Sequence, residues 1–206
     1  MSVAVAILAR RAELGKGKRR LAATLGDERT LQIYRALIGR CAAAALSSGL
    51  PATVYFEPEP GDKNVWPPSR FGYATQADSP DLGVRIADAA TRSLAAHDAV
   101  LLIGTDCPDL TADVLREAAR ALETHDAVLG PSTDGGYYLL GVKAVTPGLF
   151  DGIAWSTVEV AAQTRAVLAQ AGLRYRELPP LTDVDEEADW VAYLARAQSS
   201  APRPST

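Results

Sequence analysis

The sequence has little cysteine, no excess of basic residues and no long apolar run, and each absence excludes a class of protein. Its 206 residues include only two cysteines, Cys41 and Cys107, which cannot build a disulfide framework and favour a reducing compartment. The formal net charge of -4 gives no support for nucleic-acid binding as the main task. Because no apolar run reaches membrane-spanning length, we expect no membrane association.

We also expect no leader sequence, and two common nucleotide-binding motifs are missing from the sequence. Met1 to Ala9 is too short for a signal peptide and lacks its basic start, which predicts a cytoplasmic protein. There is no G-x-G-x-x-G, so a dinucleotide-binding fold is not expected, and no G-K-[ST] of a Walker A loop. The length fits one sizeable domain, which we expect at 1–197, followed by a Ser/Pro/Ala-rich, disordered tail at 198–206.

Predicted strands and helices alternate along the chain. An apolar run without alternation, as at 99–103, is typical of a strand buried on both faces of a parallel sheet. We expect an α/β fold, a three-layer sandwich with a mostly parallel sheet. The expected strands are 3–8, 53–56, 71–75, 99–103, 127–130, 173–178 and, antiparallel at an edge, 138–142. The expected helices are 27–46, 81–96, 111–125, 157–171 with an S-x-x-E capping box at 156–159, and a last one that follows Asp185 and runs to 197; 57–62 and 66–68 are expected loops.

Two acidic turns follow buried strands in the middle of the chain. Asp106 comes at the carboxyl end of the strand 99–103, where ligands bind in open α/β sheets. The turn 134–136 repeats this arrangement after the next strand, and its two glycines let the backbone approach a ligand. The residues expected to face a ligand are Gly104, Thr105, Asp134, Gly135, Gly136 and Tyr137, although a tyrosine is more often part of the core.

A basic glycine loop follows the first predicted strand. Backbone N–H groups and cationic side chains in such a loop converge on a phosphate, and its place after the first strand favours that function. The alternative is a solvated basic turn. The phosphate-binding residues expected here are Gly15, Lys16, Gly17, Lys18 and Arg20.

Two carboxylates far apart in the sequence are candidate metal ligands. Mg²⁺ commonly binds one or two carboxylates together with substrate phosphates, and Asp106 and Asp185 meet if both lie on the same edge of the sheet. The alternatives are a turn residue for Asp106 and a helix N-cap for Asp185. Cys107 is not expected to be a nucleophile, because no histidine lies in a recognisable partner motif.

Six motifs taken together resemble a bacterial family. They are G-K-G-K-R-R-L, D-L-G-V-R, I-G-T-D-C-P-D-L, D-A-V-L-G-P-S-T-D-G-G-Y-Y-L-L-G, W-S-T and D-V-D-E-E-A-D-W, and they cover nearly the whole chain. The family consists of glycosyltransferase-like DUF2064 proteins of the GT-A fold. Its wider superfamily, the nucleotide-diphospho-sugar transferases, includes the molybdenum-cofactor and phospholactate guanylyltransferases; D-G-G and the late D-V-D are similar to motifs of the latter.

The resemblance implies a nucleotide bound over the carboxyl ends of the central strands, with Mg²⁺ or Mn²⁺ on its phosphates. The family's P-G-x-V-K-T-R-L loop matches Gly15, Lys18 and Arg20, and its metal-binding aspartate matches Asp106. Its substrate-side turn matches Asp134, Gly135 and Gly136, and its late carboxylate matches Asp185. The sequence departs from the family pattern at Leu14, Arg19, Glu186 and Glu187, where the family has proline, threonine, threonine and proline.

We therefore expect a metal-dependent transferase that acts on a nucleotide-activated substrate. In the first hypothesis, a phosphorylated small-molecule acceptor attacks the α-phosphate of an NTP and releases pyrophosphate. Lys18 and Arg20 then neutralise the outer phosphates, while Asp106 and Asp185 hold the metal. In the second, an NDP-sugar is the donor for glycosyl transfer and Asp134 orients or deprotonates the acceptor hydroxyl. A third hypothesis is a non-catalytic nucleotide-binding protein.

Overall fold

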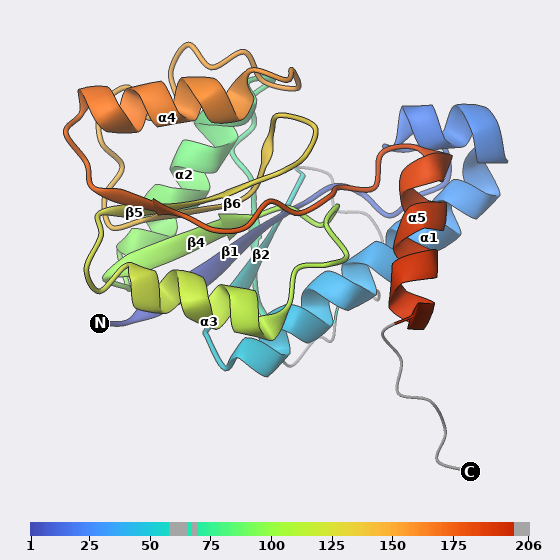
Figure 1. The fold of residues 1–206 in the computed structure, drawn as a ribbon, viewed down its shortest axis with the longest axis horizontal. Helices are drawn as coiled ribbons and strands as arrows, with labels where there is room; N and C mark the ends of the chain where they lie inside the picture. The colour runs from blue at the N-terminus through green and yellow to red at the C-terminus, as the bar shows by residue number, and fades with distance from the viewer. Residues whose placement is uncertain (58–65, 67–69, 200–206) are drawn as a thin grey trace.

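The computed structural model describes residues 1–57, 66 and 70–199, and it shows a central sheet with helices on both faces (Figure 1). Within these residues seven strands lie in the order β3-β2-β1-β4-β6-β5-β7. The strands are β1 (Val3–Ala9), β2 (Ala52–Phe56), β3 (Gly72–Thr75), β4 (Ala99–Ile103), β5 (Ala127–Pro131), β6 (Tyr137–Val142) and β7 (Tyr175–Glu177). The helices are α1 (Arg19–Ser48), α2 (Leu82–Leu94), α3 (Ala112–Ala121), α4 (Val160–Gln170) and α5 (Glu187–Ser199).

The sheet is parallel except for β6. This strand pairs antiparallel with β4 on one side and with β5 on the other, so it lies inside the sheet. The antiparallel direction was predicted correctly, but the edge position was wrong. A short turn after β5 requires an antiparallel return, and a strand as apolar as β6 is buried between two neighbours rather than left at an edge.

Helices cover both faces of the sheet, which confirms the three-layer sandwich. In Figure 1, α1 and α3 lie on one side of the strands and α2 and α4 on the other. Alternating residues of β1 point into two apolar clusters: Val5 and Ile7 pack with α1 and α3, while Ala6 packs with α2 and α4. Beside α1 lies α5, where the Arg40 guanidinium sits 5.2 Å from the ring centroid of Tyr193.

Helix α1 begins eight residues earlier than the sequence pattern predicts, at Arg19 instead of 27. The helix is interrupted at Gly26, whose φ of 75° and ψ of 166° are not helical. The sequence pattern did not predict a helix before Gly26, because a glycine disfavours helical structure and interrupts the apolar periodicity. Arg19 and Arg20 therefore belong to the start of a helix, and the glycine loop ends at Lys18.

Helix α4 begins at Val160, so the predicted capping box at 156–159 is wrong. Ser156 has a φ of 64° and does not occupy an N-cap position. Thr157 Oγ1 instead donates to the Ala154 carbonyl and accepts the N–H of Glu159. These contacts hold 155–159 as a loop, which lies against the turn after β5 and shortens the helix.

The remaining boundaries differ by a few residues. Asp81 and Thr111 cap α2 and α3 as their side chains predict, and α3 ends at Ala121, four residues before the expected end. The expected loops 57–62 and 66–68 and the tail lie largely outside the described residues, while 198 and 199 belong to α5. None of the described helices combines the length and apolar character needed to cross a membrane.

Candidate active site

A cleft of about 1040 Å³ lies at the carboxyl ends of β1 and β4. Its walls come from residues far apart in the sequence: the loop after β1, the turn after β4, the turn between β5 and β6, the loop 155–158 and the segment before α5. Nine of the residues expected from the sequence line it: Gly17, Lys18, Arg20, Gly104, Asp106, Asp134, Gly136, Tyr137 and Asp185. The parallel arrangement of β1 and β4 brings these segments together.

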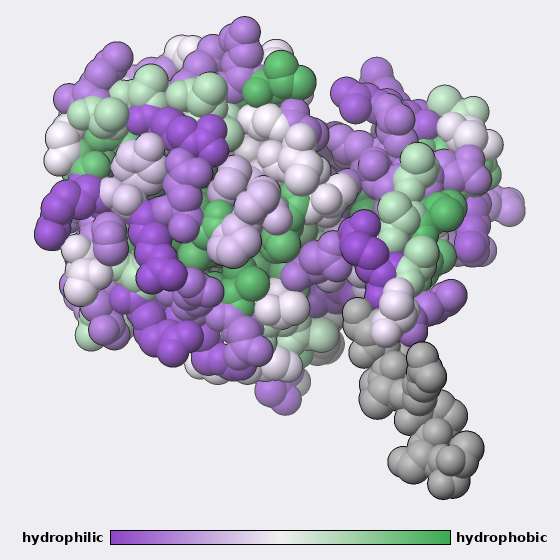
Figure 2. Space-filling model, viewed as in Figure 1, coloured by the Kyte–Doolittle hydropathy of each residue, from purple (hydrophilic) through white to green (hydrophobic). Residues whose placement is uncertain are grey.

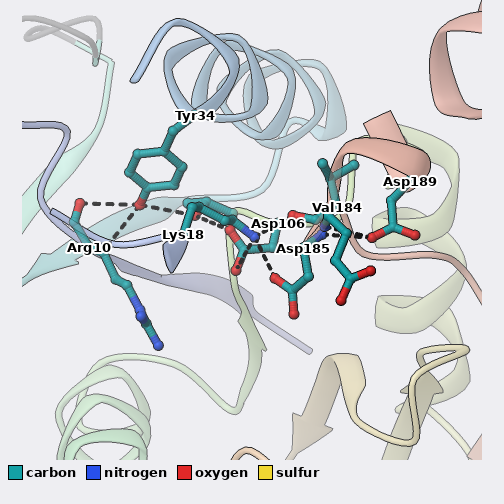
Figure 3. A network of polar contacts seen from close by, with 9 residues as sticks. Arg10, Lys18, Tyr34, Asp106, Val184, Asp185 and Asp189 are labelled. Atoms are coloured by element: carbon teal, nitrogen blue, oxygen red, sulfur yellow. Dashed lines mark hydrogen bonds and ion pairs between the residues drawn. The ribbon is translucent and has the colours of Figure 1, made fainter. Parts of the chain in front are cut away.

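At the centre of this region, the Lys18 ammonium lies between two carboxylates (Figure 3). Lys18 Nζ is 3.0 Å from Asp106 Oδ2 and 2.9 Å from Asp185 Oδ1. It also donates to the Val184 carbonyl at 2.5 Å. All three N–H bonds of this ammonium are therefore directed at protein oxygens.

Burial and charge act in opposite directions on this ion pair. The Lys18 side chain is only 7% exposed. Burial disfavours its charged form, but Asp106 and Asp185 outweigh burial and raise the pKa of Lys18 above its ordinary value. Burial likewise disfavours the Asp185 carboxylate, and the Lys18 charge outweighs it and lowers the pKa of Asp185. The ion pair thus stays charged over the physiological range.

A third carboxylate, Asp183, lies close to this pair and was not singled out as a ligand by the sequence. Its Oδ1 is buried and has no hydrogen-bond partner among the described residues. Burial, followed by the charges of Asp134 and Asp106, raises the pKa of Asp183 to about 7. A buried carboxyl oxygen without a hydrogen-bond donor, close to other carboxylates, fits a site that binds a cation.

The donor set fits a hard divalent cation. All of the acidic groups that meet here offer oxygen, the donor that Mg²⁺ prefers. Within the described residues no three His, Cys, Asp or Glu side chains form a complete metal cage. Mg²⁺ does not require one, since it keeps several waters and binds one or two carboxylates together with substrate phosphates. Asp106 and Asp185, which approach a single ammonium, satisfy this requirement.

A buried tyrosine joins the ends of β1 and β4 beneath the cleft. Tyr34 of α1 donates to the Arg10 carbonyl at 3.2 Å and accepts the Arg10 N–H at 3.1 Å. It also accepts from Thr105 Oγ1 at 3.3 Å. Burial and then Asp106 raise the pKa of Tyr34, so its hydroxyl stays protonated. The position of Asp106 relative to the loop after β1 therefore depends on this hydroxyl.

The Asp134 turn is held by its own side chain. Asp134 Oδ1 accepts from Ser132 Oγ at 2.5 Å and from the Gly136 N–H at 2.9 Å. Gly135 has a φ of 92°, and a Cβ there would collide with the Val158 backbone. The Gly135 carbonyl accepts the N–H of Ala161 at the start of α4. Gly135 thus allows the loop 155–158 to lie directly over the turn, and residues of the loop and of the turn line the cleft.

Four expected site residues do not line the cleft: Gly15, Lys16, Thr105 and Gly135. Lys16 is exposed two residues before Lys18. Thr105 is buried beneath the cleft floor and supports Asp106 through a 3.4 Å contact of its hydroxyl with Oδ1. Arg20 lines the cleft, although its side chain is exposed and lies 3.8 Å from Glu186.

Three arginines that line the cleft were not predicted as site residues: Arg10, Arg19 and Arg85. Arg10 directly follows β1, and it lines the cleft. Arg85 lies in the motif D-L-G-V-R, but no function was predicted for it from the sequence. It donates to Gln76 Oε1 at 3.3 Å, and its Nε has no partner among the described residues. The signal for Arg10 was its position, one residue beyond a buried parallel strand.

The structure also shows the surroundings of Asp185, Cys107 and Tyr137, for which the sequence allowed more than one role. Asp185 does not cap α5 through its side chain, because Asp189 accepts the N–H groups of Asp185 and Glu186. Cys107 is buried, and burial raises the pKa of its thiol, which makes it a poor nucleophile. Tyr137 packs edge-on against Trp155, and its buried hydroxyl has no partner among the described residues.

Comparison with known proteins places the chain in a family. Residues 40–157 match the family described as "uncharacterized protein conserved in bacteria (DUF2064)". No curated protein matches the sequence.

Solved structures share the fold over almost the whole length. A candidate nucleotide-diphospho-sugar transferase from Desulfovibrio desulfuricans G20 is 28% identical with a TM-score of 0.88, over 100% of this chain and 92% of that one. Rv0371c of Mycobacterium tuberculosis H37Rv in complex with manganese is 14% identical with a TM-score of 0.58, over 98% and 100%. A CMP:2-keto-3-deoxy-manno-octonic acid synthetase in complex with CTP is 11% identical with a TM-score of 0.57, over 98% and 100%.

Proposed function

Since the chain belongs to the DUF2064 family, we propose that it is a divalent-metal-dependent transferase that acts on a nucleotide-activated substrate. The observation that carries this proposal is the approach of Asp106 and Asp185 to one point of a cleft that also contains Arg10 and Arg20. Carboxylates for a metal and guanidinium groups for phosphates, at the carboxyl ends of parallel strands, suit a nucleotide with its metal. We place this function in residues 1–197 and in a reducing, cytoplasmic compartment, because both cysteines are free.

The reaction we favour is nucleotidyl transfer from an NTP to a phosphorylated small-molecule acceptor, with release of pyrophosphate. Mg²⁺ or Mn²⁺ held by Asp106 and Asp185 would neutralise charge on the substrate phosphates. Arg10 and Arg20 bind the outer phosphates by charge-assisted hydrogen bonds, and Lys18 joins them when it leaves its carboxylates. Asp134 has its second carboxylate oxygen available to orient the acceptor. Such chemistry needs positioning and charge neutralisation rather than a protein nucleophile.

Two features support this choice. The cleft of about 1040 Å³ is large enough for a nucleotide and a second small molecule. The same fold holds CTP, a nucleoside triphosphate, in the synthetase named above. Gly17, Gly104, Gly136 and Tyr137 line the cleft, whereas Gly15, Lys16, Thr105 and Gly135 do not.

Glycosyl transfer from an NDP-sugar is the second candidate. The structure with a TM-score of 0.88 is a candidate nucleotide-diphospho-sugar transferase, which favours this donor class. In this reaction the basic residues bind a diphosphate and Asp134 orients or deprotonates the acceptor hydroxyl. A non-catalytic nucleotide-binding protein with the same cleft is the third candidate, and turnover with any acceptor excludes it.

A binding screen separates these candidates. Purified protein is melted in the presence of each NTP, NMP and NDP-sugar, with Mn²⁺, Mg²⁺ or EDTA. A ligand at a hundred times its Kd adds about 2.7 kcal/mol of stability, which gives a clear shift in Tm. We expect an NTP with Mn²⁺ or Mg²⁺ to give the largest shift, and pyrophosphate to appear when phosphorylated sugars or alcohols are added. A larger shift with an NDP-sugar favours glycosyl transfer, and no shift with any nucleotide contradicts the proposal.

A further inference from the structure

The Lys18 ammonium occupies the point at which the two proposed metal-binding carboxylates meet. Its three donor positions are taken by Asp106, Asp185 and Val184. Figure 3 shows the ammonium between the two carboxylates, with Asp189 beyond them on the side of α5. A side chain in this position has no N–H left for a phosphate, so the state described here is not the one in which Lys18 binds a nucleotide.

We propose that Lys18 is an internal cation that competes with the divalent metal for Asp106 and Asp185. Metal binding displaces the ammonium, and the released side chain then contacts the phosphates of the substrate. This inference rests on the proposed function, because it assigns the metal to the same two carboxylates. It adds that the site holds one cation or the other, and that metal and nucleotide bind cooperatively as a result.

Charge and distance prevent the Lys18 ammonium and a divalent metal from occupying the site at the same time. The ammonium nitrogen is 3.0 Å or less from both carboxylates, and a Mg²⁺ ion bound to the same oxygens at about 2.1 Å would lie close to it. Two cations at such a separation repel each other, and water screens the buried ammonium only weakly. A divalent ion offers twice the charge of the ammonium, so the exchange is favourable once the ammonium has another anion to contact.

The local backbone allows the exchange to be a side-chain movement. Lys18 precedes α1 with a φ of 45° and a ψ of 46°, and Gly17 before it has a φ of 72°. The four-carbon side chain of lysine pivots at this point without unfolding the helix. Arg10 lines the same cleft, so an anion held by Arg10 lies within reach of the released ammonium. Nucleotide phosphates therefore stabilise the displaced state, which couples their binding to that of the metal.

The first test measures the affinity of Mn²⁺ alone, without nucleotide. Calorimetric titration compares wild type with Lys18→Met, which keeps the apolar stem and removes the charge, and with Lys16→Met as the matched control from the same loop. Because each charged hydrogen bond of Lys18 has to be broken in wild type, we expect Lys18→Met to bind Mn²⁺ at least about tenfold more tightly. Lys16→Met should match wild type. Equal or weaker Mn²⁺ binding by Lys18→Met than by wild type overturns the inference. The absence of Mn²⁺ binding by both wild type and Lys18→Met overturns it as well.

The second test needs no variant at position 18, so it does not depend on the folding of Lys18→Met. Wild-type protein is briefly acetylated at its amines and analysed by mass spectrometry. Lys18 is 7% exposed, so it should be protected relative to the exposed Lys16. Saturating Mn²⁺ should increase acetylation of Lys18 several-fold while leaving Lys16 unchanged, and Mn²⁺ with the best nucleotide should protect Lys18 again. Unchanged protection in Mn²⁺ contradicts displacement.

The two proposals fail in different ways. Tighter Mn²⁺ binding by Lys18→Met together with no nucleotide binding by wild type leaves the competition intact and removes the transferase. Nucleotide-dependent turnover together with equal Mn²⁺ affinities of wild type and Lys18→Met supports the transferase and removes the competition. Both measurements are made on the full chain.

Discussion

Thr105 Oγ1 donates a hydrogen bond to the Tyr34 hydroxyl across 3.3 Å, and through it the end of β4 is fixed to α1. The same hydroxyl bonds to both backbone groups of Arg10, so the end of β1 is fixed to the same point. Asp106 and the basic loop start from these two strand ends. A buried tyrosine of α1 at the wall of the cleft therefore sets the distance between the Asp106 carboxylate and the cations that line the cleft.

Tyr34→Phe removes this shared hydroxyl. We expect unfolding in urea to become easier by about 1–3 kcal/mol, because the Arg10 N–H and Thr105 lose a buried partner. Metal-dependent nucleotide affinity should also fall several-fold, because Asp106 is no longer fixed. Tyr55→Phe is the control: it breaks a buried hydroxyl pair with Ser93 away from the cleft and should cost stability alone. If both variants bind nucleotide as wild type does, Tyr34 has no positioning role.

Asp106→Asn tests the metal site directly. The substitution removes one of the two carboxylates that meet at Lys18, while Lys18 keeps Asp185 and the Val184 carbonyl. We expect metal-dependent nucleotide binding to be lost in calorimetry, with a change in unfolding free energy of only about 1–2 kcal/mol. Asp113→Asn, at an exposed carboxylate of α3 paired with Arg116, should bind as wild type does. Retention of Mn²⁺ and nucleotide affinity by Asp106→Asn contradicts the assignment.

Much of this site follows from local sequence and from the geometry of parallel sheets. The buried run at 99–103 fixes Asp106 at a strand end, and the pattern Asp134-Gly135-Gly136 marks a turn that only glycine allows. The late carboxylate Asp185 lies at the same cleft as Asp106, as the metal-site hypothesis requires. These predictions rest on one rule, the meeting of parallel strand ends, which acts independently of side-chain detail.

The features that the sequence did not predict depend on contacts between distant segments. Lys18 and Asp185 are 167 residues apart, and no local pattern indicates that the ammonium sits on the carboxylates instead of facing a phosphate. The cap of α5 by Asp189 and the break at Gly26 are equally invisible, because both compete with a more usual local arrangement. Periodicity and capping motifs describe what a segment prefers alone, and tertiary packing decides between the options.

Arg10→Ala tests which basic residues contact phosphates. Arg10 lines the cleft, whereas Lys16 does not. A charged hydrogen bond to a phosphate contributes about 1.5–3 kcal/mol, so we expect Arg10→Ala to weaken NTP binding about tenfold to a hundredfold. The NMP should be affected much less, because it lacks the outer phosphates. Lys16→Ala serves as the control with unchanged affinity, and calorimetry with NTP and NMP in Mg²⁺ measures both. An effect of Lys16→Ala as large as that of Arg10→Ala contradicts the placement of the cleft.

Because the Cys41 thiol is buried, we expect the folded protein to lose stability in alkali. Cys41 lies in α1, and its buried thiol contacts the carbonyl of Gly104, which directly follows β4. Burial, followed by the Asp106 charge, raises the pKa of Cys41 from 9.0 to about 12. Above pH 9 the unfolded chain therefore releases this proton while the folded protein retains it, which favours unfolding as the pH rises. The stability associated with the protonated Cys41 thiol is therefore fully present below pH 9 and is lost as the pH rises towards 12.

Cys41→Ala isolates this contribution. Unfolding free energies of wild type and Cys41→Ala are measured in urea from pH 8 to pH 11. The substitution costs a constant amount at low pH, since a small cavity is left. Wild type should then lose up to about 1.4 kcal/mol per pH unit more than Cys41→Ala above pH 9. Parallel curves for the two proteins mean that the thiol ionises equally in both states.

Gly135→Ala tests whether the turn after β5 and the loop over it form one unit. Gly135 and Gly148 both have a positive φ, 92° and 82°, so an alanine at either position costs about 1–2 kcal/mol in backbone strain. A Cβ at Gly148 meets nothing within 4 Å, whereas one at Gly135 collides with the backbone of Val158. We expect Gly135→Ala to cost about 1–3 kcal/mol beyond Gly148→Ala in urea unfolding, because the loop 155–158 has to move away. That movement displaces Trp155 and widens the cleft, so nucleotide affinity should fall in Gly135→Ala and stay unchanged in Gly148→Ala. Equal stability losses in the two variants mean that the loop yields without resistance, and the turn and loop then act separately.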